Sequence, residues 1–440
     1  MNNSIVAGFS KYSKQQRIKA LIEKYHFDAD LGTWFASFEV TDPAIQKIIN
    51  DLSENQVSNF QLPFSIAPNF IVNGHHLFFP LVSEESSVVA ALANAARYWA
   101  SRGGFHAEVL GTEKKGMVHF KWKGKIEKLR LLFPEIKERL LAESSFLMTN
   151  MVARGGGISS LELKEMNHVL PNYFQLDASF QTCDAMGANF INSCLEQFAK
   201  SLQRYFRTSD NVTGDENDCE NIMAILSNYT PDSRVHAWVE CPVIVLLEGK
   251  SEEENRLFAR KFEEAILISQ CDMGRAVTHN KGIFNGIDAL AMATGNDLRA
   301  IEACGHAFAA RNGSYRGLTE VQVTERTFRF SIELAIAVGV VGGLTGVHPL
   351  AKPALQILGN PSAPELMMYL AVAGLASNFA SVKSLVSIGI QHGHMKLHLN
   401  NIMNQLDIPE ERGPEIQLYF QDKTISFSAV EHYWKNHPYE

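Results

Sequence analysis

The chain has 440 residues, of which 46% are apolar and 20% are charged. Its 40 Lys and Arg side chains against 48 Asp and Glu side chains give a formal net charge of −8 at pH 7. This composition excludes a mainly disordered or collagen-like chain, and the mild acidity argues against a basic nucleic-acid-binding surface. A chain of this length predicts roughly two to three domains, each able to bury a hydrophobic core.

The cysteines and the N-terminus indicate an intracellular protein. The six cysteines include no C-x-x-C pair, so we expect scattered reduced thiols and no disulfide framework. The first residues lack the charged region and continuous apolar core of a secretory signal. The apolar stretch at 334–347 has about 14 residues, against about 20 needed to span a bilayer, and we expect it to be buried. The sequence therefore predicts a soluble, cytoplasmic protein.

The N-terminal part predicts helices on either side of a β-hairpin. Residues 1–50 carry apolar side chains at helical spacing. Between 60 and 80, two apolar runs flank Asn73-Gly74, which is a strong hairpin signal. An alanine-rich helix is expected over 86–101, because acidic residues precede it and two glycines follow it.

The composition changes near residue 107, and we place a smaller α+β domain at 109–226. Strands are expected at 109–111, 117–122 and 174–180, and amphipathic helices at 126–141 and 185–202. Such a mixture of strand-like and helix-like segments is typical of an α+β domain.

Helices dominate from residue 252 onward. One apolar helical face is expected over 298–308. A capping box at 362–365 predicts the start of a long helix that reaches Ile388. This helix is apolar nearly all round, which is typical of a helix at the centre of a core. A shorter helix from about Met395 begins the C-terminal tail.

The densest cluster of polar residues and glycines lies between Arg275 and Asp297. Two cations, two amides and a carboxylate alternate there with glycines, which let the backbone approach a ligand. An ordinary Gly-rich turn leading to a helix capped by Asn296 or Asp297 explains the same residues. The pattern alone gives the two interpretations equal weight.

Two expected helix starts carry residues suited to chemistry. Glu85 lies at the first, where acidic residues are common because they complement the helix dipole, so a structural role explains it well. The second, at 184–189, has small residues that suit either a phosphate site or tight packing around Gly187. Neither a G-x-G-x-x-G motif after a strand nor a G-x-x-x-x-G-K-S/T motif occurs, so Rossmann and P-loop folds lack their main support.

Three histidines near the C-terminus raise the question of a metal site. His394 and His398 are four residues apart, which places them on one helical face, and His392 lies close by. The segment lacks the Glu of H-E-x-x-H and has no acidic third ligand nearby. A metal-dependent hydrolase that uses these histidines is therefore an alternative hypothesis.

Taken together, these segments resemble the class II (bacterial-type) 3-hydroxy-3-methylglutaryl-coenzyme A reductases, over about residues 50–402. Several separate motifs occur in the family's order, which makes the resemblance specific. They are Glu54-Asn55 with Val57, Asp184-Ala-Met-Gly-Ala-Asn189, Arg275 with Thr278-His-Asn-Lys281-Gly and Asn285-Gly, Ala293-Thr-Gly-Asn-Asp297, Val338–Gly343 with His348-Pro, and Gly389-Ile-Gln-His-Gly-His394-Met.

The resemblance implies an oxidoreductase that converts 3-hydroxy-3-methylglutaryl-CoA to mevalonate and CoA, or the reverse, by two hydride transfers with NADPH or NADH. It implies an α+β fold: a mostly helical large domain (1–108 and 227–388) with a long central helix, an inserted small non-Rossmann cofactor domain (109–226) and a C-terminal flap (389–440). Family members are homodimers with interfacial active sites, and we expect the same here, without metal, nucleic acid or membrane. A non-catalytic binding module is a second alternative, against which the retained catalytic residues argue.

Family roles carry over to matching positions of this chain. Lys281 would place its ammonium at the carbonyl oxygen, Glu85 would donate the proton, and Asp297 would organise both. His394 would protonate the departing thiolate. The residues that hold the hydroxymethylglutaryl end would be Ser87, Arg275 and Asn285. The cofactor-binding residues would be Asp184, Ala185, Met186, Gly187, Ala188, Asn189 and Ser160.

Physical chemistry sets conditions on these roles. A fixed ammonium aimed at a developing oxyanion contributes on the order of 3 kcal/mol. The helix dipole lowers the pKa of a Glu at a helix start, so Glu85 needs burial or the charge of Asp297 to raise that pKa before it can donate a proton. The same dipole disfavours an imidazolium at His394, which makes its proton easier to give.

One departure from the family pattern concerns the cofactor. Relatives often carry Gly-Gly-Gly-x-Arg-Asp where this chain reads Gly155-Gly-Gly-Ile-Ser-Ser160, and in NADH-using relatives that Asp binds the adenosine ribose. Ser160 removes a carboxylate that would repel a 2′-phosphate. We therefore expect NADPH to be preferred over NADH, with Lys164 as a candidate partner of the phosphate.

Overall fold

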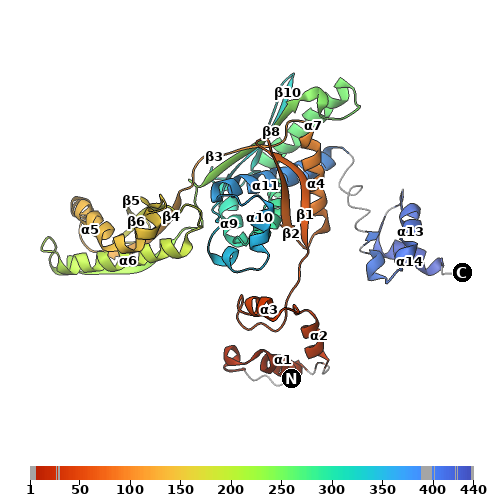
Figure 1. The fold of residues 1–440 in the computed structure, drawn as a ribbon. Coiled ribbons are helices and arrows are strands. Elements are labelled where there is room, and N and C mark those ends of the chain that lie inside the picture. The colour runs from red at the N-terminus through yellow and green to blue at the C-terminus, as the bar shows by residue number, and fades with distance from the viewer. Residues whose placement is uncertain are drawn as a thin grey trace.

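Three short helices open the chain: α1 (Lys14–Tyr25), α2 (Leu31–Ser37) and α3 (Pro43–Asn50). The computed structural model describes residues 6–25, 27, 30–387, 399–400, 402–421, 423 and 425–437. Figure 1 shows these helices at the N-terminal end, joined by an extended segment to the strands that follow. The helical opening predicted from the sequence is confirmed.

The predicted hairpin forms and leads the chain to the helix that carries the site. Strand β1 (Phe64–Val72) pairs antiparallel with β2 (His75–Val82). Asn73 and Gly74 join them with φ of 50° and 83°, the left-handed conformation that Asn-Gly favours in two-residue turns. Helix α4 (Ser86–Ala100) follows and packs on β1. Glu85 thus lies between a strand and a helix that are held together.

Residues 114–226 build a separate α+β unit. Its antiparallel sheet has the order β5-β6-β4-β7, from β4 (Lys114–Trp122), β5 (Gly157–Glu165), β6 (Tyr173–Gln181) and β7 (Cys219–Leu226). Helices α5 (Ile126–Val152) and α6 (Ala188–Thr208) bury apolar side chains against this sheet, in a core separate from that of the rest of the chain. Helix α5 continues beyond the predicted end at 141, and α6 starts after Gly187.

The large domain contains a four-stranded antiparallel sheet that the sequence analysis did not predict. Its order is β3-β8-β10-β9, from β3 (His106–Val109), β8 (Arg234–Pro242), β9 (Thr319–Val323) and β10 (Thr327–Ala335). Every second side chain of β10 is buried, as a half-exposed strand requires. The apolar run at 334–347 is the end of this strand followed by a loop, and residues 341–344 are exposed. The expectation that the whole run is buried is wrong.

Five helices complete the large domain: α7 (Glu252–Cys271), α8 (Met273–Ala293), α9 (Leu298–Ala309), α10 (Ala351–Ile357) and α11 (Ala363–Val386). Helix α11 packs against α8, α4 and β8, at the centre of the domain (Figure 1). It begins at the predicted capping box of Ser362 and Glu365. Among the described residues it alone is long and apolar enough to cross a membrane, and 72% of its apolar window is buried inside the protein. The predicted central core helix is confirmed.

Residues 273–293 form one continuous helix, so neither a ligand-binding loop nor a Gly-rich turn occupies this segment. Gly282 and Gly286 lie inside α8. A Cβ on Gly286 would come within 2.4 Å of the carbonyl oxygen of Ala373 on α11, so this glycine allows two helix backbones to approach closely. Gly286 therefore serves helix packing, which a sequence pattern cannot separate from loop formation.

The C-terminal residues form a small helical unit with its own apolar cluster, which includes Ile416 of α13 (Gly413–Tyr419) and Val430 of α14 (Phe427–Asn436). Residues 388–398 lie outside the described residues, and with them Gly389, Met395, His392, His394 and His398. The flap and the roles of these histidines stay predictions.

Candidate active site

The structure brings two of the predicted catalytic residues together within one chain. The Lys281 Nζ on α8 lies 3.2 Å from the Glu85 Oε2 at the start of α4. The two residues are 196 positions apart in sequence, and the packing of α8 against β2 and α4 closes that separation. Both side chains remain partly exposed, so the ion pair faces a space that a substrate can enter.

Serine side chains hold the Glu85 carboxylate in place. The Ser87 hydroxyl donates to Glu85 Oε1 at 2.6 Å, and the backbone N–H of Glu85 donates to the Ser83 hydroxyl at 3.1 Å. Glu85 occupies the N-cap position of α4, but its side chain does not cap that helix. The carboxylate points instead at Ser87 and Lys281, so helix capping does not explain this residue.

The two residues before Lys281 fix the helix behind it. His279 is 1% exposed, its Nε2 lies 2.6 Å from the Thr319 hydroxyl, and burial lowers its pKa to about 3, so it is neutral. Asn280 is fully buried and donates to the Arg316 carbonyl at 2.8 Å while accepting from the Leu318 N–H at 3.0 Å. These contacts anchor one face of α8, and Lys281 projects from another.

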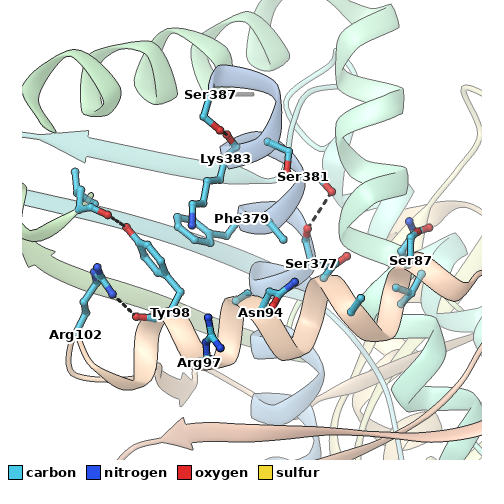
Figure 2. A pocket seen from close by; sticks show the side chains of 18 of the residues that line it. Ser87, Asn94, Arg97, Tyr98, Arg102, Ser377, Phe379, Ser381, Lys383 and Ser387 are labelled. Atoms are coloured by element: carbon cyan, nitrogen blue, oxygen red, sulfur yellow. Dashed lines mark hydrogen bonds between the residues drawn. The ribbon is translucent and has the colours of Figure 1, made fainter. Parts of the chain in front are cut away.

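A groove of about 770 Å³ extends from Glu85, the partner of Lys281, along α4 and α11. Glu85, Ser87 and Asn285 line one end of the groove. Figure 2 shows Arg97 and Tyr98 of α4, and Arg102 just after it, opposite Ser377, Ser381 and Lys383 of α11. The Lys383 Nζ lies 4.2 Å from the centre of the Tyr98 ring, and the Arg102 guanidinium lies 3.9 Å from it. One end of the groove therefore carries a carboxylate and an amide, and the other end is mainly cationic. Glu248 contributes a carboxylate to the lining of the cationic end.

Sequence reasoning missed the α11 side of this groove. Ser377, Ser381 and Ser384 line it and follow one another at helical spacing of four and three residues, a polar stripe on an otherwise apolar helix. That stripe is a signal that the sequence carries. The helix is apolar nearly all round, as expected, and the serine stripe is the part of its surface that this expectation left out.

Asp288, on the same helix as Lys281, lies near two carboxyl groups from other segments, Glu302 of α9 and Glu84 before α4. Burial, followed by the charge and hydrogen bond of Glu302 and the charge of Glu84, raises the pKa of Asp288 to about 8. The Asp288 Oδ1 is buried without an N–H or O–H partner among the described residues. Asp288 is therefore protonated at neutral pH and shares a hydrogen bond with Glu302.

The comparison with known proteins identifies the family. The sequence profile described as hydroxymethylglutaryl-coenzyme A reductase matches residues 14–399. The chain belongs to this family. The 3-hydroxy-3-methylglutaryl-coenzyme A reductase of Archaeoglobus fulgidus is 34% identical over 411 residues, which cover 91% of this chain and 87% of that protein. The probable enzyme of the same name from Borreliella burgdorferi is 32% identical over 409 residues, covering 92% and 90%.

Solved structures of a class II reductase share the fold. The Streptococcus pneumoniae enzyme bound to NADPH in open conformations superposes with a TM-score of 0.72 at 34% identity, covering 87% of this chain and all of that chain. A second structure of the pneumococcal enzyme gives 0.71 over 98% of this chain. The chain is thus a class II reductase that converts hydroxymethylglutaryl-CoA to mevalonate with NAD(P)H, as the sequence resemblance implies.

The structure does not place Asp297 of this reductase in contact with Lys281. Asp297 caps α9, accepting from the N–H groups of Arg299 and Ala300 at 3.0 and 3.3 Å, and pairs with the Arg299 guanidinium. Burial raises its pKa, but the Arg299 side chain and the Ala300 N–H outweigh burial and leave the pKa below its usual value. The helix-cap interpretation of Asp297 is confirmed, and its catalytic role stays a prediction.

Two further predicted substrate residues lie on α8 with Lys281. Asn285 follows Lys281 by one helical turn and lines the groove. Arg275 lies in the first turn of α8, where its backbone N–H donates to the capping Asp272 at 2.6 Å. Partial burial lowers the pKa of Arg275, which remains a cation. One helix therefore carries both predicted cations and the amide.

The predicted cofactor segment, 184–189, lies between β6 and α6 of the small domain of the reductase and hydrogen-bonds to the large domain. Asp184 accepts from the Val340 N–H at 2.9 Å and, through its side chain, from the Ala363 N–H at 2.8 Å. Gly187 has a φ of 92°, and a Cβ there would lie 2.4 Å from the Thr182 Cγ2. Tight packing thus explains Gly187, while the free N–H groups at the start of α6 leave room for an anion.

Ser160, a predicted cofactor-binding residue, and Lys164, the candidate partner of a 2′-phosphate, lie on β5. Ser160 pairs with Ser179 of β6. Lys164 forms an ion pair with Asp177, so it already has a carboxylate partner. The turn before β5 contacts the cofactor segment, because a Cβ on Gly156 would meet the Cys183 sulfur at 3.0 Å. Ser160 therefore lies on a strand that starts next to this segment.

No group of three His, Cys, Asp or Glu side chains suited to a metal occurs among the described residues. The three histidines of the metal alternative lie outside those residues, and so does His394 as a candidate acid. The hydrolase alternative gains no support from the comparisons, which all give the reductase.

Proposed function

We propose that the Glu85–Lys281 pair is the reacting centre of the reductase. Hydride addition to the thioester carbonyl, and then to the aldehyde, places negative charge on the carbonyl oxygen. The Lys281 ammonium, held by the anchored helix α8, stabilises that charge, and a preorganised group of this kind contributes on the order of 3 kcal/mol. The distance of 3.2 Å between Lys281 Nζ and Glu85 Oε2 carries this proposal.

Glu85 is assigned to supply the proton that the alkoxide takes up, once the bound substrate has buried its carboxyl group. Its carboxyl oxygen is within hydrogen-bond reach of Lys281, so an oxygen bound at the ammonium lies next to it. Ser87 orients the carboxyl group. On the family resemblance, Ser87, Asn285 and Arg275 are assigned to the hydroxymethylglutaryl end, and the last two share α8 with Lys281. Asp297 is assigned to the electrostatic support of Lys281 on the family resemblance, and His394 to protonation of the CoA thiolate.

The groove is proposed to hold the coenzyme A arm of the substrate. Glu85 and Arg97 are 12 positions apart on α4, which corresponds to about 18 Å along a helix. A thioester at the Glu85 end would therefore place an extended arm along α4, with its phosphates near Arg97, Arg102 and Lys383. Burial and then the charge of Arg102 lower the pKa of Lys383. Such an effect is expected in a cluster of cations that binds an anion.

The nicotinamide cofactor, which supplies the hydrides, is proposed to bind at the turn of 184–189. The start of α6 offers free N–H groups and the positive end of the helix dipole to its phosphates. The pneumococcal neighbour is bound to NADPH, and Ser160 lacks the carboxylate that would repel a 2′-phosphate. We propose NADPH as the preferred cofactor. Ser160→Asp should shift the NADPH/NADH ratio of kcat/KM toward NADH, and an unchanged ratio would refute this assignment.

The assembled enzyme is proposed to be a metal-free homodimer in which the C-terminal unit (389–440) covers the site. That unit has its own apolar cluster, which supports the proposal that it folds as a separate unit and moves relative to the large domain. The separate cores of 114–226 and of the large domain likewise support the proposed domain division at 109–226.

An absorbance assay tests the proposed function directly. With hydroxymethylglutaryl-CoA present, two reduced nicotinamides should be oxidised for each CoA thiol released and each mevalonate formed. Glu85→Gln keeps the size of the side chain and its contact with Ser87, and it should lower kcat by about a hundredfold or more. Near-normal turnover of Glu85→Gln would remove Glu85 from the proton-transfer step.

A further inference from the structure

One buried cation lies outside the reacting centre and has no part in the steps above. Lys114 is the first residue of β4 and is 4% exposed. Its Nζ donates to the Thr182 hydroxyl at 2.7 Å and to the Ala185 carbonyl at 3.4 Å. No carboxylate among the described residues lies within ion-pair distance of it. A buried ammonium held only by neutral oxygens costs folding free energy, so it needs a compensating role or a partner.

The neighbours of Lys114 all belong to the junction between the two domains. A cavity of about 10 Å³, the size of one water molecule, lies beside it. The cavity is lined from the small domain, the segment that follows it, α9 and the residues after β10, by Lys114, Met186, Ile191, Leu226, Ser227, Asn228, Thr230, Ala300 and Ala337. The first turn of α9, which follows Asp297, therefore meets the cofactor turn at Lys114.

The hydrogen bonds of Lys114 fix the turn that precedes α6. The Thr182 hydroxyl, which accepts from Lys114, donates to the Ala185 carbonyl at 2.6 Å, and the Ala185 N–H donates back to the Thr182 carbonyl at 3.0 Å. The ammonium thus clamps both ends of this turn. The orientation of the Ala185 peptide in turn sets the direction of the N–H groups that open α6.

We propose that Lys114 is a positioning residue for the nicotinamide cofactor, which holds the turn of 182–187 and adds a positive charge beneath the cofactor's phosphates. This inference rests on the proposed cofactor site. The inference assigns this role to Lys114 and not to the neighbouring Lys115, because Lys115 points to the opposite face of β4 and pairs with Asp232 at 2.8 Å.

The charge state of Lys114 gives the inference a second readout. Burial lowers the pKa of Lys114 to about 8, and the nearby Cys183 thiol raises it by a smaller amount. The other residues that line the cavity are uncharged. Lys114 is therefore charged at pH 7 and loses its proton as the pH rises through about 8, so the affinity for NADPH should fall over that range.

Fluorescence titration of NADPH onto the full-length enzyme tests the inference, with Lys114→Met against Lys115→Met as a matched control. A lost hydrogen-bonded charge predicts a Kd about tenfold higher for Lys114→Met at pH 7, and a Kd within twofold of wild type for Lys115→Met. The weakening of binding between pH 7 and pH 9 should disappear in Lys114→Met, and the KM for hydroxymethylglutaryl-CoA should not change.

Two results would overturn the inference. One is a Lys114→Met enzyme with wild-type NADPH affinity and wild-type pH dependence. The other is an equal rise of both KM values together with a lower melting temperature, which would mark a purely structural lysine. Absence of NADPH binding by the wild-type enzyme would instead refute the proposed cofactor site, so the two failures are distinguishable.

Discussion

Two glycines in the helix that carries Lys281 should respond in opposite ways to the same substitution. A Cβ on Gly286 would lie 2.4 Å from the Ala373 carbonyl oxygen and 2.9 Å from the Ser377 Cβ. The first of these atoms is backbone and cannot rotate away. A Cβ on Gly282 would meet nothing closer than 3.8 Å. Gly286→Ala should therefore destabilise the enzyme and Gly282→Ala should stabilise it.

The magnitudes follow from two opposing effects. Replacing an interior helical glycine by alanine gains up to about 1 kcal/mol of helix propensity. Forcing atoms into a packed interface costs about 1–3 kcal/mol, and the upper part of that range applies where backbone is struck. We expect Gly286→Ala to lose about 1–2 kcal/mol net and Gly282→Ala to gain up to about 1 kcal/mol, a separation of about 2–3 kcal/mol.

Thermal unfolding of the two variants and the wild type, followed in parallel with NADPH oxidation, measures this separation. Gly286→Ala should melt several degrees lower and should also lose kcat, because a displaced α8 moves Lys281 and Asn285. Equal melting temperatures for the two variants would refute the close approach of α8 and α11. A destabilised Gly282→Ala would show that the space beside that glycine is not open.

Three further predictions test separate parts of the site. Ser87→Ala removes the 2.6 Å hydrogen bond to Glu85 and should lower kcat about tenfold at unchanged NADPH affinity; an unaltered kcat would show that Glu85 orients itself. The folded-state pKa of Asp288 is raised to about 8, so this residue makes the free energy of unfolding of the wild type fall as the pH rises from about 4 to 8. The free energy of unfolding of Asp288→Asn should therefore rise relative to wild type over that range, by at most about 1.4 kcal/mol per pH unit. The same difference between the two proteins at pH 5 and at pH 8 would contradict this. Arg97→Ala should raise the KM for hydroxymethylglutaryl-CoA about tenfold with kcat preserved and with an effect that shrinks as salt increases, and a salt-independent change would argue against a phosphate contact.

Local patterns predicted the elements that depend on local chemistry. The Asn73-Gly74 turn and the capping box at 362–365 act through neighbouring residues, so the hairpin and the start of α11 follow from sequence. The second sheet pairs β8 with β3 and with β10, which are far from it in the chain. The alternating pattern of β10, the clearest sequence signal of this sheet, runs into an adjoining apolar stretch. Glycine-rich spacing likewise left a ligand-binding segment and a Gly-rich turn open at 275–297, because a sequence does not show that Gly286 packs against α11.

The residues of the candidate site were likewise only partly predictable from local sequence patterns. Residue patterns left Glu85 and the segment of 275–297 with structural explanations of equal or greater weight, and the family resemblance alone selected Glu85 and Lys281 as partners. The contact between them depends on how α8 packs against β2 and α4, which no local pattern encodes. The cationic end of the groove and the buried Lys114 appear only once α4, α11 and the domain junction are assembled.

The turnover of Lys281→Met, measured beside Lys261→Met as a control on the surface of α7, tests the central claim most directly. Loss of the ammonium at the carbonyl oxygen should lower kcat by about a hundredfold or more, while the Kd for NADPH and the melting temperature stay at wild-type values, and Lys261→Met should behave as wild type. A Lys281→Met enzyme that still reduces hydroxymethylglutaryl-CoA to mevalonate at close to the normal rate would contradict the account.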